Sequence, residues 1–243
     1  MLGVQMKLVV ALMFLVLLNG CASSDMRPQL ERGMGNIPTT QYATAQTVEE
    51  IRKLRPQARL PLKIAVIASD RYSGLSLEER AVVEQLGEKL KQIGFASSVQ
   101  LVPKSLIPQC GYKSDSDCFL NQSRLAGARL GADALLFLSD TAVTDSYVNP
   151  LSILNLTLVG MWIAPAHHRD SYSVYEAALF DIDNGYLYAV AEGHGEYKIV
   201  RPYMYVEYRT GQEQARVNAL KDISVKLYAR SQEQMNKLAA PTK

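Results

Sequence analysis

The stretch Leu62-Lys63-Ile64-Ala65-Val66-Ile67-Ala68 decides the fold class of this 243-residue chain. It is apolar at every position but one, which predicts a strand buried on both faces of a sheet. The next segment, Leu77 to Ile93, has apolar residues at helical spacing, and Gly94 is a natural helix end. A buried strand followed by an amphipathic helix is the opening of a sheet with helices packed on it.

The rest of the chain continues this alternation and then changes style. An Asn184-Gly185 pair between two strand-like runs predicts a hairpin. The full order is βαβαβ-β-β-α, which predicts an α/β (α+β) fold with a mixed sheet and helices packed on it. The expected elements after Gly94 are strands at Ser98–Val102, Ala134–Leu138, Tyr172–Ile182 and Tyr186–Val200, and helices at Phe119–Leu130 and Arg209–Leu238.

The amino terminus predicts export and lipid anchoring. Leu8 to Leu18 is an uncharged apolar run, long enough for a signal peptide and too short for a membrane-spanning helix. The following Leu18-Asn19-Gly20-Cys21 resembles the bacterial lipobox. That resemblance implies cleavage before Cys21, diacylglycerol on its thiol with palmitate among the acyl chains of the mature cysteine, and attachment to a membrane. Ala22 replaces the aspartate of inner-membrane retention, which implies the periplasmic face of the outer membrane.

Composition divides the chain into parts. Residues 1–20 are the expected signal peptide, and residues 21–59 are the lipidated cysteine with a polar tether rich in proline and glycine. A short helix is expected inside the tether near Val48 to Leu54. Residues 60–238 form the expected single globular domain, and residues 239–243 a tail. The formal net charge of +2 and the lack of a basic cluster argue against nucleic acid as a partner.

Two further cysteines, Cys110 and Cys118, enclose a polar loop. In an oxidising compartment such a pair predicts a disulfide. The spacing does not fit a Cys-x-x-Cys metal knuckle, and no histidine is near in sequence. Free thiols remain the alternative.

The element order, with the strand opening at Lys63 to Ile67, resembles a group of envelope domains. The group comprises the amino-terminal domain of TolB, the lipoprotein activator of penicillin-binding proteins and the curli-secretion lipoprotein. The resemblance covers about residues 60–235 and implies a membrane-anchored envelope protein. Through the curli-secretion member it also implies a homo-oligomeric secretion or channel component.

A second resemblance is to the rhombotarget lipoproteins. It rests on Asn149-Pro150, on Gly160 through Pro165 and on Tyr186 through Gly193. It implies location and fold and no activity. Many members carry a carboxy-terminal sorting segment, which the ending Ala239-Ala240-Pro241-Thr242-Lys243 does not resemble.

Few residues suggest chemistry. Glu192, His194 and Glu196 would share one face of a strand, where they either bind a metal or form a solvated face. In the second case the intervening glycines mark a bulge or close packing. His167 and His168 are expected in a turn, where adjacent side chains point apart and cannot easily share one ion. Phosphate loops, dinucleotide fingerprints and nucleophile elbows are missing from the sequence. We therefore expect no enzyme activity, no cofactor and no metal.

The candidate binding surface comes from two stretches. Leu151 to Ala166 carries no charge and holds Met161 and the only tryptophan, Trp162. The first interpretation of this stretch is a core strand with its loops. The second is an apolar contact surface for a partner or a membrane. A nearby group rich in tyrosine and arginine is typical of binding surfaces; its members are Tyr197, Arg201, Tyr203, Tyr205 and Tyr208. The alternative is a plain connection between an edge strand and a helix. The sequence thus favours a non-enzymatic adaptor that binds an envelope protein.

Overall fold

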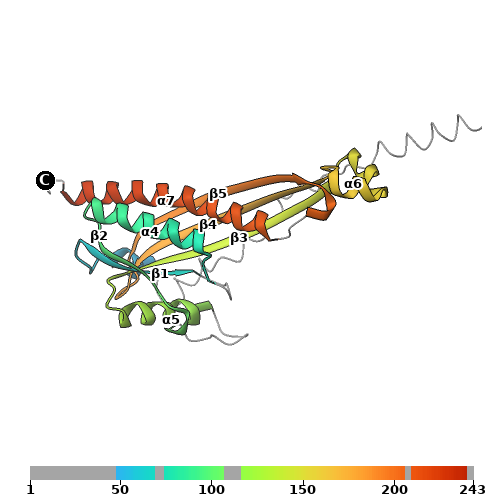
Figure 1. Cartoon of the computed structure of the whole chain (residues 1–243). Helices are drawn as coiled ribbons and strands as arrows, with labels where there is room; N and C mark the ends of the chain where they lie inside the picture. Colours follow the sequence, from blue (N-terminus) through green and yellow to red (C-terminus); the bar gives the residue numbers. More distant parts are fainter. Residues whose placement is uncertain (1–47, 69–73, 107–115, 206–208, 240–243) are drawn as a thin grey trace, which may run out of the picture.

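A computed structural model describes residues 48–68, 74–106, 116–205 and 209–239. Its centre is one five-stranded sheet in the order β2-β1-β3-β4-β5 (Figure 1). In this order β1 pairs in parallel with β2 and with β3, and β4 pairs antiparallel with β3 and with β5. The sheet is therefore mixed, as the sequence predicts. The strands are β1 (Leu62–Ala68), β2 (Ala96–Leu101), β3 (Ala134–Val148), β4 (His167–Asp181) and β5 (Leu187–Arg201).

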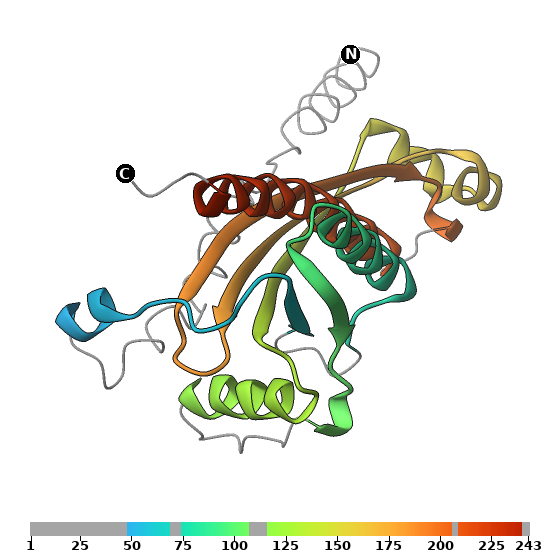
Figure 2. The same cartoon turned by 90° about the vertical axis from the view of Figure 1, so that its left-hand side faces the viewer.

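Helices cover both faces of the sheet (Figure 2). On one face, α4 (Leu77–Gln92) and α7 (Thr210–Ala239) pack against β1, β3, β4 and β5 and form the main apolar core. On the other face lies α5 (Ser116–Arg129), where Gly127 sits so close to Ile182 and Ala65 that an added Cβ would reach 2.8 Å from Ile182 Cδ1. The central β1 is buried on both sides, which explains its apolar composition.

Helix α4 is fixed at its start by a capping box. The Ser76 hydroxyl accepts from the Glu79 N–H, and the Glu79 carboxylate accepts from the Ser76 N–H. Glu79 is nonetheless buried, and its other oxygen accepts a 2.8 Å hydrogen bond from the Tyr175 hydroxyl in β4. A single carboxylate therefore caps the helix and joins it to the sheet.

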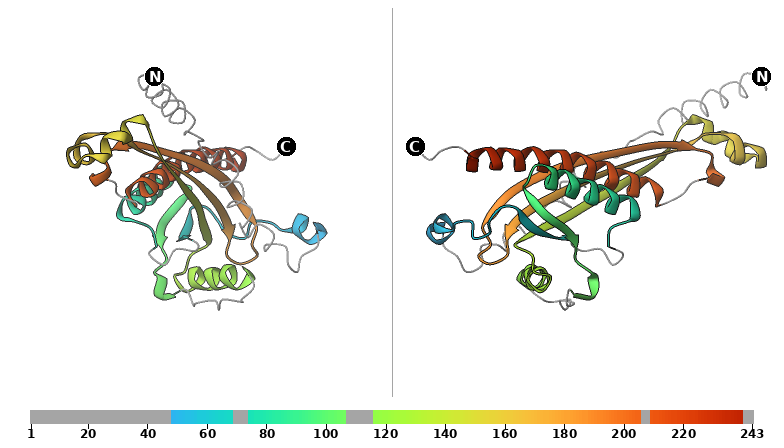
Figure 3. Two further views of the ribbon diagram at one scale, coloured as in Figure 1. Left: turned by 90° about the vertical axis from the view of Figure 1, so that its right-hand side faces the viewer. Right: turned by 60° about the vertical axis from the view of Figure 1, so that its left-hand side comes forward.

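Strands β3, β4 and β5 are each 15 residues long, far longer than β1 and β2. They extend beyond the helices as a three-stranded arm (Figures 1 and 3). The arm ends in η3 (Pro150–Leu156), α6 (Leu158–Ile163) and η4 (Tyr203–Tyr205). The molecule consequently has two ends, a body and a distant tip.

The tip and the arm correct three sequence-based expectations. The interpretation of Leu151 to Ala166 as a core strand is wrong, since this segment forms η3 and α6 at the surface. The strand expected to end at Leu138 continues to Val148, because β4 pairs with it along its whole length. His167 and His168 begin β4 and do not lie in a turn.

Beside β5, α7 covers the outer edge of the sheet. Polar side chains of α7 satisfy backbone groups that a further strand would otherwise use. Asp222 accepts from the His194 N–H at 3.0 Å, and Lys226 and Asn218 donate to the carbonyls of Glu192 and Glu196. This edge is therefore closed to strand addition along that stretch.

Upstream of β1, α3 (Val48–Lys53) falls where a short helix is expected, and its side chains are exposed. Within the four described segments, no helix combines the length and the hydropathy needed to cross a bilayer.

Candidate functional site: an apolar tip

The candidate site is the end of the arm, which we call the apolar tip: residues 149–166 with η4, Tyr203–Tyr205. No acidic or basic residue occurs in either segment. The strands β3, β4 and β5 carry it, so its position depends on their unusual length (Figure 1).

Asparagine and threonine caps shape the tip. Asn149 caps η3, since its side-chain oxygen accepts from the Leu151 N–H at 3.0 Å and Pro150 takes the first helical position. Thr157 caps α6 by accepting from the Gly160 N–H at 2.9 Å. Gly160 has no room for a side chain, because a Cβ there would lie 1.8 Å from the Leu154 carbonyl oxygen. These contacts fold the uncharged segment into two short helices, η3 with 7 residues and α6 with 6 residues.

Two histidines join the tip to the arm. His167 Nε2 lies 3.1 Å from Asn155 Nδ2, and its ring packs on Tyr203 with centroids 5.1 Å apart. His168 Nε2 lies 3.1 Å from Asn149 Nδ2, and its ring stacks on Tyr147 at 4.8 Å. The two rings point apart, as expected for neighbours on an extended chain. Each ring therefore contacts its own asparagine and tyrosine, and the two rings are not arranged to bind one ion together.

The aliphatic side chains of the tip face solvent. Leu156 is 87% exposed and Leu158 76%, whereas a large apolar side chain in a folded protein is usually covered. Exposed large apolar side chains gathered at one end of a molecule are typical of interaction sites. The other exposed apolar side chains of the tip are Leu151, Ile153, Leu154, Val159, Trp162, Ile163, Tyr203, Met204 and Tyr205.

Most of the residues named as candidates from sequence meet here. Trp162 lies on α6 with its ring edge on Tyr205, the centroids 5.7 Å apart. Tyr203 and Tyr205 form η4, and Arg201 ends β5 and donates to the Tyr205 carbonyl at 3.5 Å. Met161 is half-buried on α6 beside Trp162.

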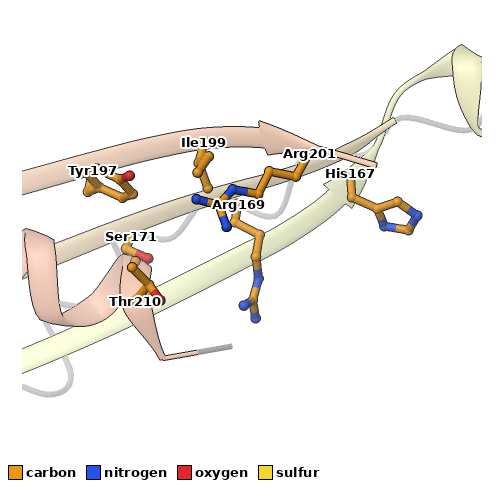
Figure 4. A pocket seen from close by; sticks show the side chains of 8 residues that line it. His167, Arg169, Ser171, Tyr197, Ile199, Arg201 and Thr210 are labelled. Atoms are coloured by element: carbon orange, nitrogen blue, oxygen red, sulfur yellow. The ribbon is translucent and has the colours of Figure 1, made fainter. Parts of the chain in front are cut away.

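Tyr197 lies apart from that group, farther back along β5. It lines a small pocket between the tip and the start of α7, together with side chains of β4 and β5 (Figure 4). Among the residues that line this pocket there is no carboxylate. Its residues are His167, Arg169, Ser171, Tyr197, Ile199, Arg201, Thr210 and Gly211.

The most exposed members of the tip were not singled out individually from sequence. Leu156, Leu158, Val159 and Ile163 belong to a stretch recognised only as uncharged. A pattern in the sequence could have predicted the helices that carry them. Aliphatic residues combined with the potential helix caps Asn149 and Thr157 and with Gly160 indicate short helices and not a strand.

The strand face with Glu192, His194 and Glu196 is solvated. His194 Nε2 lies 2.9 Å from Glu192 Oε1, and Glu196 pairs with Lys198, which raises the pKa of that lysine. No group of three potential ligands able to hold a metal occurs among the described residues. Gly193 and Gly195 face α7, where a Cβ would lie 2.4 Å and 2.0 Å from the carbonyl oxygens of Ala219 and Ala215. The glycines therefore mark close packing.

Four candidate positions are not tested. Cys21, Cys110 and Tyr208 lie outside the described residues, and Cys118 falls within α5. Lipidation of Cys21 and the Cys110–Cys118 disulfide stay predictions.

Comparison with known proteins gives a fold-level likeness. No family model and no curated protein matches the sequence. Similar solved structures include the PelC dodecamer of Paraburkholderia phytofirmans, with 12% identity over 73% of this chain and 91% of that one and a TM-score of 0.32. Lipoprotein GNA1162 of Neisseria meningitidis has 13% identity over 73% and 99%, with a TM-score of 0.31.

A protein of Helicobacter pylori assigned as a homologue of neuraminyllactose-binding hemagglutinin has 10% identity over 78% of this chain and 96% of that one, with a TM-score of 0.37. Bacterial lipoproteins are thus among the structures to which this chain is similar. At these identities and TM-scores the likeness transfers no function. The more specific resemblance to the TolB group stays a prediction.

Proposed function

We propose that the protein is a lipid-anchored, non-enzymatic adaptor of the bacterial envelope, which binds another envelope protein through its apolar tip. The anchor half rests on the lipobox-like Leu18 to Cys21. The proposed location, the periplasmic face of the outer membrane, rests on Ala22 in place of an aspartate after that cysteine. The binding half rests on one observation: an uncharged, exposed apolar surface is held at the end of an arm by capped and buttressed helices.

The composition of the tip supports binding over catalysis. Trp162, Tyr203 and Tyr205 are large, rigid side chains that supply much of the energy of protein interfaces, and Arg201 lies at their border. Catalysis in contrast needs positioned acids, bases or nucleophiles, and the tip has no charged residue in its two segments. An adaptor role also requires neither cofactor nor metal.

The decisive experiment is site-specific photocrosslinking in living cells from benzoylphenylalanine placed at Leu156. We expect a discrete protein adduct, identified by mass spectrometry. In a second chain carrying Trp162→Ala, capture should fall about thirtyfold, which corresponds to about 2 kcal/mol of binding free energy. Because Trp162 is 47% exposed, its loss should leave the thermal midpoint of unfolding nearly unchanged.

The chain offers a matched control. Leu77 at the start of α4 is 84% exposed, close to the 87% of Leu156, and lies on the body. Leu156→Asp should abolish capture from a crosslinker at Ile163, whereas Leu77→Asp should not affect it. Equal loss in both variants, or early melting of Trp162→Ala, would contradict the adaptor function of the tip.

The alternative, a self-assembling secretion or channel component, has no observation of its own in its favour. Helix α7 closes the β5 edge from Glu192 to Glu196, so copies cannot join through that stretch by strand pairing. Regular rings in negative-stain images of the detergent-extracted protein would favour assembly over the adaptor.

A further inference from the structure

A buried carboxylate fixes where the chain enters the domain. Asp181, at the end of β4, is fully buried and accepts hydrogen bonds from the Gln57 N–H at 2.8 Å and the Ala58 N–H at 3.2 Å. The Tyr188 hydroxyl donates to the same oxygen at 2.7 Å. The other oxygen accepts from the Asp183 N–H at 2.9 Å in the β4–β5 turn.

A second contact acts at the same place. Asn184 of the turn donates from Nδ2 to the Arg55 carbonyl at 2.7 Å. The segment that follows α3 is thus held against the β4–β5 turn by side chains more than a hundred residues away in sequence. We call Asp181 and Asn184, with their partners at residues 55–58, the latch.

The latch and the tip lie at opposite ends of β4. His167 begins that strand at the tip and Asp181 ends it at the latch. With a rise of about 3.3 Å per residue, a 15-residue strand separates its two ends by about 45 Å. Figure 3 shows α3 beside the β4–β5 turn, with η3 and α6 at the far end of the arm.

From this polarity we infer that the tip engages a protein held away from the anchoring membrane, with the arm acting as a fixed spacer; this rests on the proposed function. The lipid on Cys21 would connect to the latch end, so the tip is the part of the domain farthest from the point where the anchored segment joins it. The occupant that this polarity favours is a protein and not the bilayer that holds Cys21.

The length of chain outside the structure sets the reach. Residues 22–47 lie between Cys21 and α3, and 26 residues of chain span at most about 90 Å when fully extended. The arm adds about 45 Å beyond the latch. The maximum distance between membrane and partner is therefore set by the number of residues between Cys21 and α3 together with the length of the arm.

The experiment uses the full, lipidated chain in cells. Deleting residues 26–43 shortens the maximum reach by about 60 Å. In the control chain, a Gly/Ser segment of equal length replaces those residues. With the crosslinker at Leu156, we expect the shortened chain to lose capture at least tenfold at unchanged membrane level, and the Gly/Ser chain to recover it.

A second measurement addresses the bilayer directly. Trp162 is the only tryptophan, so its fluorescence reports on the tip alone. In vesicles of phosphatidylethanolamine and phosphatidylglycerol with brominated acyl chains, the anchored protein should keep its full emission. Quenching would place the tip in the anchoring bilayer and overturn the inference, as would undiminished capture by the shortened chain. Failure of capture by the full-length chain would instead refute the proposed function itself, and the inference with it.

Discussion

At the scale of single residues, the buried Asp181 carboxylate accepts five hydrogen bonds. Burial alone would raise its pKa, but the hydrogen bonds from the Tyr188 hydroxyl and from the N–H groups of Gln57, Ala58 and Asp183 outweigh burial and lower the pKa. The pKa of Tyr188 is raised, first by burial and then by its hydrogen bond to the Asp181 carboxylate. The ionised carboxylate is therefore the form that the fold prefers.

This lowered pKa predicts acid sensitivity. A carboxyl with a lowered pKa in the folded state stabilises the protein fully above its ordinary value of about 3.9, and the stabilisation disappears as the pH falls through the lowered pKa. In Asp181→Asn the unfolding free energy should fall by about 3 kcal/mol at neutral pH, because buried donors lose a charged acceptor. Its thermal midpoint should depend less on pH between 5 and 3 than that of the native chain.

The control for this variant is Asp183→Asn. Asp183 lies two residues away in the same turn and is exposed, and its backbone N–H and carbonyl take part in the hydrogen bonds of the turn. Melting curves of both variants between pH 5 and 3 would show whether the loss of stability is specific to the Asp181 carboxylate. Equal and small effects would show that the Asp181 carboxylate does not hold the latch.

The pair Cys110 and Cys118 carries a second residue-scale prediction. In an exported chain we expect both sulfurs to be joined, closing a short loop and contributing about 2–3 kcal/mol. Alkylation of the native protein before reduction should label neither cysteine, and labelling after reduction should reach both. Full labelling of both residues without a reductant would exclude the disulfide.

At the scale of elements, the contact between β5 and α7 depends on two glycines. Gly195→Ala places a methyl group 2.0 Å from the Ala215 carbonyl oxygen, against backbone that has no rotamer to change. We expect a loss of about 3 kcal/mol or more, because an overpacked interface must separate. Calorimetry should show a thermal midpoint lower by about 6–12 °C.

The neighbouring His194→Ala is the matched control for that substitution. His194 points from the opposite face of β5 and is exposed beside Glu192. Its loss should change the unfolding free energy by no more than about 0.5 kcal/mol. If this face bound a metal, His194→Ala would lower the thermal midpoint of unfolding, and so would adding a chelator to the native protein.

At the scale of the whole molecule, the anchor determines where the tip acts. Cys21→Ser removes the thiol that a diacylglycerol group would modify, so the variant should leave the membrane fraction and lose the lipid mass at its amino terminus. Fractionation with intact-mass spectrometry checks both. A Cys21→Ser protein that still partitions with membranes at an unchanged mass would refute the anchor.

The sequence by itself determined the order of elements, because that information is local. Three local patterns each predict one element from a few neighbouring residues, and all three elements appear in the fold. They are the apolar run Leu62 to Ala68, the helical spacing of Leu77 to Ile93 and the Asn184-Gly185 turn. The close packing of Gly193 and Gly195 was also foreseeable, since glycine between strand residues often marks a near neighbour.

Only the tertiary structure decided what Leu151 to Ala166 does. An uncharged stretch is equally compatible with a core and with an exposed surface, and which of them forms depends on whether another element covers it. Strands β3, β4 and β5 pair with one another along 15 residues and pass beyond the helices, so nothing in the described part of the chain lies over the tip. The latch at Asp181 was equally invisible, because its partners at Gln57 and Ala58 are brought to it by the fold alone.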